Sequence, residues 1–495
     1  MRKRSAKKKR STATRIRTKA VMKKRVTKDT SDEVFVTKTE IPTEPIQITD
    51  FFNTDYCNFG SYDNYRKLAS IVDGFKPSAR KCIYIILKDK ITNLFKVQNL
   101  CARVSEKTNY IHGATSLYGV IVGLAQNFVG TNNVPLLQRK GNFGNRLIPD
   151  ASADRYIFTC AEKYLDDIIK EEDNDILVEQ IFEGDVIEPK FYVPIIPLIL
   201  VNGSIGLTTG FTQKILPRNP KEIIEWINCK LDKTKFKGKL LPYYKGFLGT
   251  IKETSKGVYD IYGAYEKISA NRIRITDIPC GPGISGFRDL KSYLAILDKL
   301  VETKKIKDYY DYSESNQYNI EVVFYRNEKN GLDIDKSDLY KELRLVKSVN
   351  ESYSSMNEEN KVVEYKSVED ILNNYFKVRY SFYEKRKENI IQKLTNKILT
   401  EVSKYTFIKG VIDGDIILNN KSEEQIIKKI ETIKNIIKVN DSYDYLLNMP
   451  LSSITKEKYE KLKENIKELN KQLNDIKNET IEEMWKKDLA KLSFD

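Results

Sequence analysis

Two segments near the C-terminal end carry apolar residues at helical spacing, and they constrain the fold more than any other feature. The first segment contributes Ile391, Leu394, Ile398, Val402 and Tyr405. The second contributes Tyr459, Leu462, Ile466, Leu469, Leu473 and Ile476. A three- and four-residue period predicts helices with one apolar face. Since about three heptads are too few for a free coiled coil, we expect two long helices packed antiparallel on each other.

The piece between these helices, Phe407 to Leu451, carries apolar residues of its own, such as Ile416 to Leu418 and Leu446-Leu447. A globular knob at the tip of a long hairpin has little of its own chain to pack against. We therefore expect the knob to dimerise.

Length and composition narrow the class of protein. A chain of 495 residues is too long for one ordinary core and predicts two to four domains. No apolar run reaches the roughly 18 residues of a membrane span, and the N-terminus has no signal-peptide core, so we expect an intracellular protein with no membrane partner. The six cysteines form no C-x-x-C pair and the chain has one histidine. This pattern argues against a disulfide framework, a zinc site and a His-rich metal site.

The positive charge is concentrated at the N-terminus. Of the 84 Lys and Arg, 14 lie between Met1 and Lys28, which leaves 70 basic against 69 acidic residues in the rest. Residues 1 to about 45 lack apolar periodicity, so we expect a disordered polycationic tail. A DNA-binding arm, a nuclear-targeting signal and a solubilising segment all fit it. DNA affinity of the folded part must come from local patches.

The region after the tail predicts a DNA-binding domain. Helices are expected around Phe51-Phe52, at Tyr62–Ile71, at Pro77–Leu87 and at Ala114–Phe128. Short helices before a longer one and a Gly-rich loop are typical of a winged-helix domain. The helix that would enter the groove starts just after His112-Gly113.

The middle of the chain predicts a second, smaller α/β domain over about 240 to 350. Strands are expected at Gly249–Ile251, Val258–Tyr262, Arg272–Pro279 and Ile320–Tyr325, with a helix at Phe287–Val301. Residues 347 to 362 are rich in Ser, Asn and Glu and predict an exposed loop. Before this domain, Pro194–Gly203 is a buried apolar run, and Leu207 beyond it is either a core residue or an exposed wedge between base pairs.

The sequence Asp150-Ala-Ser-Ala-Asp-Arg155-Tyr156 is the strongest candidate for chemistry. A tyrosine phenol has a pKa of about 10, so it attacks phosphorus well only where cations stabilise its oxyanion and the phosphate. Upstream, Lys76 supplies a basic group, His112 an imidazole, and the Gly141–Gly144 loop flexible backbone.

These motifs, in this order, resemble the DNA breakage-and-reunion subunit of type IIA topoisomerases from about Phe51 to the C-terminus. The organisation is most similar to the medium subunit of T-even-type phage topoisomerases, and also to gyrase A. The segments Tyr118–Phe143 and Phe191–Pro217 look even more like the eukaryotic single-chain enzyme. The resemblance implies an α+β multidomain fold. It has a basic tail (1–45), a winged-helix DNA-gate domain (46–235), an α/β tower (236–365) and a long antiparallel coiled coil (366–495) with a dimerisation knob at about 407–451.

The resemblance also implies roles for individual residues. Tyr156 falls on the nucleophile that forms a 5′-phosphotyrosine link, and Arg155 on the residue that steadies the scissile phosphate. Arg66 and His112 fall on residues that stabilise the transition state. The implied DNA-binding residues are Lys76, Arg80, Lys81, Thr115 and Leu207, the last in place of an intercalating Ile. Thr115 and Gly119 occupy the quinolone-sensing positions, and the lack of an acid at 119 argues against ordinary quinolone sensitivity.

No ATP motif is found, and no acidic metal motif is placed for catalysis. The resemblance therefore implies that Mg²⁺ and ATP are bound by a separate ATPase/TOPRIM subunit in an A2B2 assembly, with duplex DNA and a second copy of this chain as further partners. A phage protein acting in the host cytoplasm or in a nucleus-like compartment fits this organisation. Two alternatives are a non-catalytic architectural dimer that kept the fold and a tyrosine recombinase. The first predicts decay at Tyr156, Arg155 or His112, and the second needs another Arg/His set near the C-terminus.

Overall fold

The computed structural model describes residues 46–281, 289–326, 331–419, 421–439, 441–450 and 455–494. The basic tail, 1–45, and the predicted end of the knob at Leu451 lie outside this part of the chain. The chain divides into two compact units, Met1–Asn58 and Phe59–Asp495. No helix among the described residues is both long enough and apolar enough to cross a membrane.

The described part of the first unit is helical. It contains α2 (Ile48–Phe51), the π-helix η1 (Phe52–Tyr56) and the first residues of α3 (Cys57–Lys67). The rings of Phe51, Phe52 and Tyr56 pack edge to face or tilted, with centroids 5.1 to 6.3 Å apart. The helix expected around Phe51-Phe52 is therefore present.

In the second unit, three helices pack on one another close to the candidate site. They are α4 (Pro77–Lys88), α5 (Val97–Thr108) and α6 (Ala114–Ala125). Pro77 occupies the first turn of α4, where its missing N–H costs nothing, and Ile83 and Ile86 are buried. The helix predicted at 62–71 ends earlier than expected, at Lys67, and the helix predicted at 114–128 ends at Ala125. Helix α5 was not predicted, although Val97, Leu100, Cys101, Val104 and Thr108 are buried on one face of it.

Short elements complete this part of the core. The helices are α7 (Leu165–Ile168), the 3-10 helix η2 (Glu171–Ile176), α8 (Leu198–Val201) and α9 (Pro220–Leu231). Strands β1 (Phe95–Lys96) and β2 (Phe158–Thr159) pair, as do β3 (Ile181–Phe182) and β4 (Asp185–Val186). The apolar run predicted to be buried lies in the core, with all four residues of α8 buried.

One prediction is wrong. Residues 347 to 362 are not an exposed loop, because they contribute β13 (Val346–Asn350), β14 (Ser352–Met356) and the start of β15 (Val362–Glu364). With β5 (Ser204–Leu207) and β6 (Thr212–Ile215), strands β14 and β15 form a sheet in the order β15-β14-β6-β5. Ser354 and Ser355 are buried because the Gln213 amide donates to the Ser354 carbonyl and the Ser355 hydroxyl, both at 2.9 Å. A polar segment can be buried when its hydrogen bonds are satisfied, and composition alone could not reveal these partners.

A second hydrophobic core is formed mainly by residues of the segment from Tyr244 to Val349. Leu147 and Leu216, which precede this segment in the chain, also belong to it. Its strands are β7 (Thr250–Ser255), β8 (Val258–Tyr262), β9 (Ala264–Ser269), β10 (Arg272–Asp277), β11 (Asp308–Asp311) and β12 (Ile320–Val323), and its helices are α10 (Leu290–Glu302) and α11 (Leu339–Glu342). The sheets run antiparallel in the orders β11-β12-β10-β9 and β13-β8-β7. The strands predicted at 258–262, 272–279 and 320–325 are present, which gives a mixed α/β fold with small antiparallel sheets.

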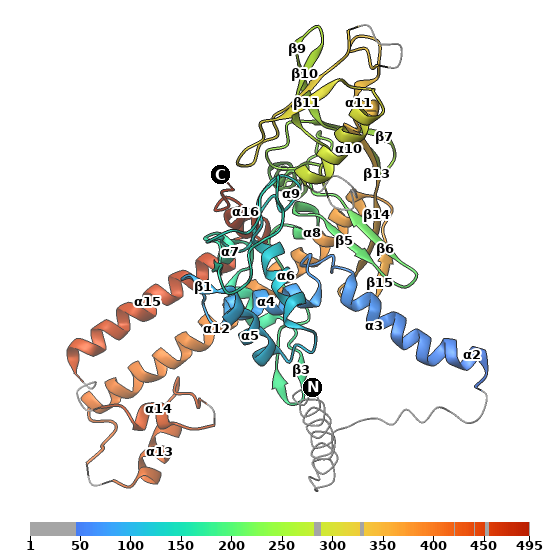
Figure 1. Cartoon of the computed structure of the whole chain (residues 1–495). Helices are drawn as coiled ribbons and strands as arrows, with labels where there is room; N and C mark the ends of the chain where they lie inside the picture. The colour runs from blue at the N-terminus through green and yellow to red at the C-terminus, as the bar shows by residue number, and fades with distance from the viewer. Residues whose placement is uncertain are drawn as a thin grey trace, which may run out of the picture. The chain divides into compact units, whose positions relative to one another are not determined.

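The C-terminal region is helical, as its spacing predicted. Helix α12 (Val368–Ile412) has 45 residues, and α15 (Lys456–Asn478) returns beside it (Figure 1). Lys387 reaches the Lys477 carbonyl while the rings of Tyr405 and Tyr459 stack, so the two helices are antiparallel. The expected apolar residues Ile391, Leu394, Ile398 and Val402 pack with Leu469 and Leu473.

Between these helices lie α13 (Glu423–Glu431) and α14 (Asp444–Leu447). They share a small core of Phe407, Ile416, Ile430, Tyr443 and Leu446.

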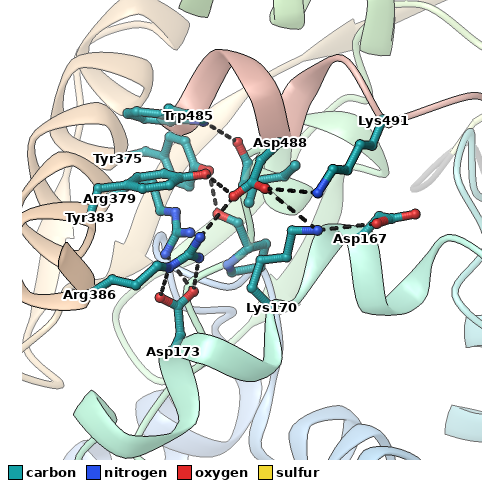
Figure 2. A network of polar contacts seen from close by, with 12 residues as sticks. Asp167, Lys170, Asp173, Tyr375, Arg379, Tyr383, Arg386, Trp485, Asp488 and Lys491 are labelled. Carbon is teal, nitrogen blue, oxygen red and sulfur yellow. Dashed lines mark hydrogen bonds and ion pairs between the residues drawn. The ribbon is translucent and has the colours of Figure 1, made fainter. Parts of the chain in front are cut away.

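A buried ionic network joins the base of this helical pair to the main core (Figure 2). Asp173 of η2 accepts from Arg379 at 2.8 Å and from Arg386 at 2.7 and 2.5 Å, both on α12. Arg386 also donates to Asp488 of α16 (Ile481–Leu489) at 2.8 Å. Tyr383 lies against both guanidinium groups, 4.0 and 4.5 Å from its ring centroid. Buried charges of this kind are stable only when paired, so the network fixes the three elements relative to one another.

Candidate active site

Local backbone structure places His112 between two helices. Helix α5 ends at Thr108, and Asn109 caps it in the left-handed conformation with φ 47°. Gly113 then serves as the N-cap of α6, so His112 lies in the short connection. Its ring packs edge to face on Tyr110 at 5.4 Å, and its Nε2 lies 3.5 Å from the Tyr62 hydroxyl.

His112 and Arg66 line the same cavity of about 660 Å³. Lys81, Glu188, Phe182 and Tyr62 are among its other wall residues. Arg66 is exposed, and only a long 3.7 Å contact joins it to Asp63. Two of the four predicted catalytic side chains are therefore brought together, with the Arg66 cation free to meet an anion.

The Tyr156 side chain is presented to solvent on a well-anchored backbone. It is 65% exposed, whereas Ile157 beside it is fully buried. The backbone of Phe158 exchanges both hydrogen bonds with Lys140, and a side chain at Gly141, which has φ +99°, would lie 3.3 Å from the Tyr156 carbonyl. The Arg155 guanidinium carbon lies 4.8 Å from the Tyr156 ring centroid. A phenol held in the open beside a permanent cation is suited to nucleophilic attack on a phosphate.

The described residues that line the His112 cavity do not include Tyr156 or Arg155. The backbone of Asp154 and Ile157 accepts from Gln98 and Val97 at the N-terminal end of α5. His112 follows the opposite end of this helix, which is about 18 Å long at 1.5 Å per residue. Within one chain, the two halves of the candidate site are thus attached at opposite ends of α5.

The predicted DNA-binding cations are more enclosed than expected. Arg80 is only 2% exposed and binds Asp73 at 2.7 and 3.2 Å, so its position does not suit the direct DNA contact that we expected. The Lys81 ammonium donates to the Thr108 carbonyl at 2.6 Å and to Glu188 at 2.9 Å. The Lys76 ammonium donates to the Ile205 carbonyl at 2.6 Å, and burial lowers the pKa of this lysine. The resemblance implied DNA binding for Arg80, and only the fold shows that Asp73 pairs with it.

Leu207 lies at the end of β5, where the strand turns into β6. Gly206 before it packs so closely that a Cβ atom would lie 2.5 Å from the Lys67 carbonyl oxygen, while Leu207 itself is 72% exposed. The Asp63 carboxylate accepts from the Thr209 backbone at 3.1 Å and holds the turn. The structure therefore excludes Leu207 as a core residue, and its role as a wedge between base pairs stays a prediction.

Helix α6 presents small groups to solvent. Thr115 is exposed, and a Cβ atom added at Gly119 or Gly123 would meet no atom within 4 Å. Leu117, Ile121 and Ala125 bury the opposite face. The exposed face therefore allows the close approach of a large partner.

The residues of this site do not fit the Mg²⁺ that the resemblance implies. Hard divalent cations need several oxygen ligands, and the described residues contain no cluster of three or more His, Cys, Asp or Glu able to hold a metal. The acids nearest to Arg66 and Lys81 are Asp63 and Glu188, which already bind Lys67 and Lys81 at 2.8 and 2.9 Å. These two acids are therefore not placed to coordinate a divalent cation.

Residues 66–490 match the family model for the A subunit of DNA gyrase/topoisomerase IV. The chain belongs to this DNA gyrase/topoisomerase IV family. Its relatives include the mitochondrial DNA topoisomerase 2 of Dictyostelium discoideum, 31% identical, and the DNA topoisomerase 2 of Invertebrate iridescent virus 6, 32% identical. Each alignment covers 90% of this chain but only 35% and 39% of the relative. This member of the gyrase/topoisomerase IV family thus spans little more than a third of these curated relatives.

A solved structure agrees with the assignment to the gyrase/topoisomerase IV family. The Plasmodium falciparum topoisomerase II DNA-binding, cleavage and re-ligation domain superposes with a TM-score of 0.78 at 30% identity. The match covers 89% of this chain and 63% of that chain. The family resemblance that the motifs indicated is therefore confirmed.

Proposed function

We propose that this chain breaks and rejoins both strands of duplex DNA so that a second duplex can pass. The observation that carries the proposal is the exposed Tyr156 phenol beside Arg155 in a chain of the gyrase/topoisomerase IV family. The Tyr156 oxygen loses its proton, attacks phosphorus and forms a P–O bond, while the bond from phosphorus to the 3′ oxygen breaks. The 3′ oxygen takes up a proton and leaves as a hydroxyl, and the phosphate stays on the tyrosine as a 5′-phosphotyrosine. Because one phosphodiester replaces another, the reverse attack reseals the strand without an external energy source.

The cations of the site supply the electrostatic part of this reaction. Negative charge grows on the phosphate oxygens in the transition state, and preorganised donors aimed at that charge lower the barrier. Arg155 is beside the nucleophile, and Arg66 and His112 form the second group of donors. Since these two groups are attached at opposite ends of α5, we propose that Tyr156 of one protomer works with Arg66 and His112 of a second copy.

The wider assembly follows from the same proposal. We assign residues 46–235 to a winged-helix cleavage domain, 236–365 to a tower, and 366–495 to a coiled coil whose knob, about 407–451, dimerises. In line with the family resemblance, Mg²⁺ and ATP are assigned to a separate ATPase/TOPRIM subunit in an A2B2 complex. The ion pairs of Asp63 and Glu188 support the assignment of Mg²⁺, because these two acids are already engaged with lysines. The place of action is with DNA inside a cell, and the viral relative supports a phage origin.

Mixed dimers test the shared site. Tyr156→Phe and Arg66→Ala chains carrying different tags are co-expressed, purified through both tags and assayed with the partner subunit, Mg²⁺ and supercoiled plasmid. In a shared arrangement one site of each mixed dimer is intact and the other carries both changes, so mixed dimers nick one strand. Each homodimer is expected to lose about 100-fold or more of its cleavage.

Mixed dimers as inactive as both homodimers would show that each chain builds its site alone. Reactions lacking the partner subunit or Mg²⁺ serve as controls and are expected to give no cleavage. A non-catalytic architectural dimer would give no protein-linked DNA in any reaction, including that of the unmodified chain.

Leu207→Ala tests the wedge. Insertion between base pairs costs a few kcal/mol of unstacking, which contacts with the bent duplex offset. The variant is expected to bend DNA less and to cleave it more slowly, while its stability changes by no more than about 0.5 kcal/mol because the side chain is exposed. Fluorescence energy transfer across an end-labelled duplex measures the bend. Leu248→Ala, which removes another exposed leucine, is the matched control, and equal bending by the two variants would refute the wedge.

A further inference from the structure

Tyr62 is a side chain of the His112 cavity to which neither the motifs nor the family comparison assigns a role. It lies on α3, one helical turn before Arg66. Its hydroxyl lies 3.5 Å from Nε2 of His112, and the Arg66 guanidinium carbon lies 5.9 Å from its ring centroid. Tyr62 therefore contacts both members of the second donor group, from one helix face.

A packing role does not account for this tyrosine. Its side chain is 49% exposed, so it contributes little to the core. Tyr65, one turn further round the same helix, also lines the cavity but is more buried, and burial raises the pKa of its phenol. The exposed ring and the position of its hydroxyl instead indicate a task at the cavity surface.

The hydrogen bond to Nε2 decides what His112 can do while it is neutral. In a neutral imidazole one ring nitrogen carries the proton and the other is a bare acceptor, and the partner of one nitrogen sets the state of the other. If Nε2 donated to Tyr62, Nδ1 would present a lone pair and would repel a phosphate oxygen. If the Tyr62 hydroxyl donates to Nε2, Nδ1 keeps its proton and becomes a hydrogen-bond donor.

We propose that Tyr62 is a positioning residue, whose hydroxyl donates to Nε2 of His112 and keeps the imidazole proton on Nδ1 for a phosphate oxygen. The same ring lies beside Arg66 and holds this cation next to the imidazole. A separation of 3.5 Å is at the long end of the hydrogen-bond range, which is common in catalytic contacts before substrate binds. The role of this contact in cleavage rests on the proposed function, whereas the tautomer does not.

Because His112 is the single histidine of the chain, its ring can be observed without assignment. The full chain with isotope-labelled histidine is examined by NMR at a pH where the imidazole is neutral, since protonated and bare ring nitrogens have well-separated chemical shifts. The expected result is a proton mainly on Nδ1 in the unmodified chain and a shift toward Nε2 in Tyr62→Phe. Tyr65→Phe removes a hydroxyl from the same cavity and is expected to leave the tautomer unchanged.

Cleavage is measured on the same variants with the partner subunit, Mg²⁺ and duplex DNA. Loss of one neutral hydrogen bond is expected to slow single-turnover cleavage by Tyr62→Phe about threefold to tenfold, with DNA affinity unchanged. Tyr312→Phe, which removes an exposed phenol outside the candidate site, is expected to cleave at the rate of the unmodified chain.

A proton on Nε2 of His112 in the unmodified chain would overturn the proposed contact. The same tautomer in the unmodified chain and in Tyr62→Phe would also overturn it. A changed tautomer with an unchanged cleavage rate would overturn its role in the reaction. If the unmodified chain forms no protein-linked DNA, the proposed function fails while the spectra still decide the contact.

Discussion

Tyr156→Phe is expected to abolish formation of protein-linked DNA while leaving the fold and DNA binding intact. The change removes only the hydroxyl oxygen that would become bonded to phosphorus. Loss of a nucleophile from an enzyme that depends on covalent catalysis lowers the rate on the order of 10⁶-fold. Since the side chain is largely exposed, stability should change by no more than about 0.5 kcal/mol. Denaturant trapping of end-labelled DNA, with Mg²⁺ and the proposed ATPase/TOPRIM subunit present, measures the adduct.

Tyr312→Phe is a suitable control, because Tyr312 is an exposed tyrosine near the second core with no place in the candidate site. It should cleave at the rate of the unmodified chain. Recovery of protein-linked DNA from Tyr156→Phe would assign the covalent link to another residue. Peptide mapping of the adduct from the unmodified chain identifies the bonded residue directly.

Asp173→Asn is expected to lower the free energy of unfolding by about 3–5 kcal/mol, because it leaves Arg379 and Arg386 with buried charges that lack their main partner. Asp173 is only 2% exposed and accepts from both guanidinium groups. Urea denaturation followed by tryptophan fluorescence suits the measurement, because Trp485 is fully buried beside the network and donates to the Ile195 carbonyl at 3.0 Å.

Asp175→Asn provides a matched control on the same 3-10 helix. Asp175 also pairs with a basic residue of α12, Lys393, and that hydrogen bond lowers the pKa of the carboxyl. Both partners are about half exposed, so solvent screens the pair and its loss should cost less than about 1 kcal/mol. Equal urea midpoints for the two variants would mean that the buried network contributes no more than a surface ion pair.

The candidate site could be predicted from the sequence only where function depends on a local motif. Arg155-Tyr156 follows a run of small residues, and His112 precedes the N-cap glycine of α6, so both are visible in the order of residues. Tyr62 was missed, although its spacing from Arg66 on a predicted helix is a signal that could have pointed to it. Its contact with His112 joins residues 50 positions apart, and no local pattern contains that information.

Period alone was enough to predict the two long C-terminal helices, since the 3.6-residue repeat is a local property of the chain, although α5 was missed despite its one buried face. The packing of Ile398 with Leu469 and Leu473 agrees with the predicted antiparallel pair. By contrast, the burial of Arg80 against Asp73, the strand at Ser352–Met356 and the three-element network around Asp173 were decided by tertiary structure. In each case a polar group is stable inside the protein only because a partner outside its own local segment supplies the missing hydrogen bond or charge. The order of residues along the chain does not by itself identify this partner.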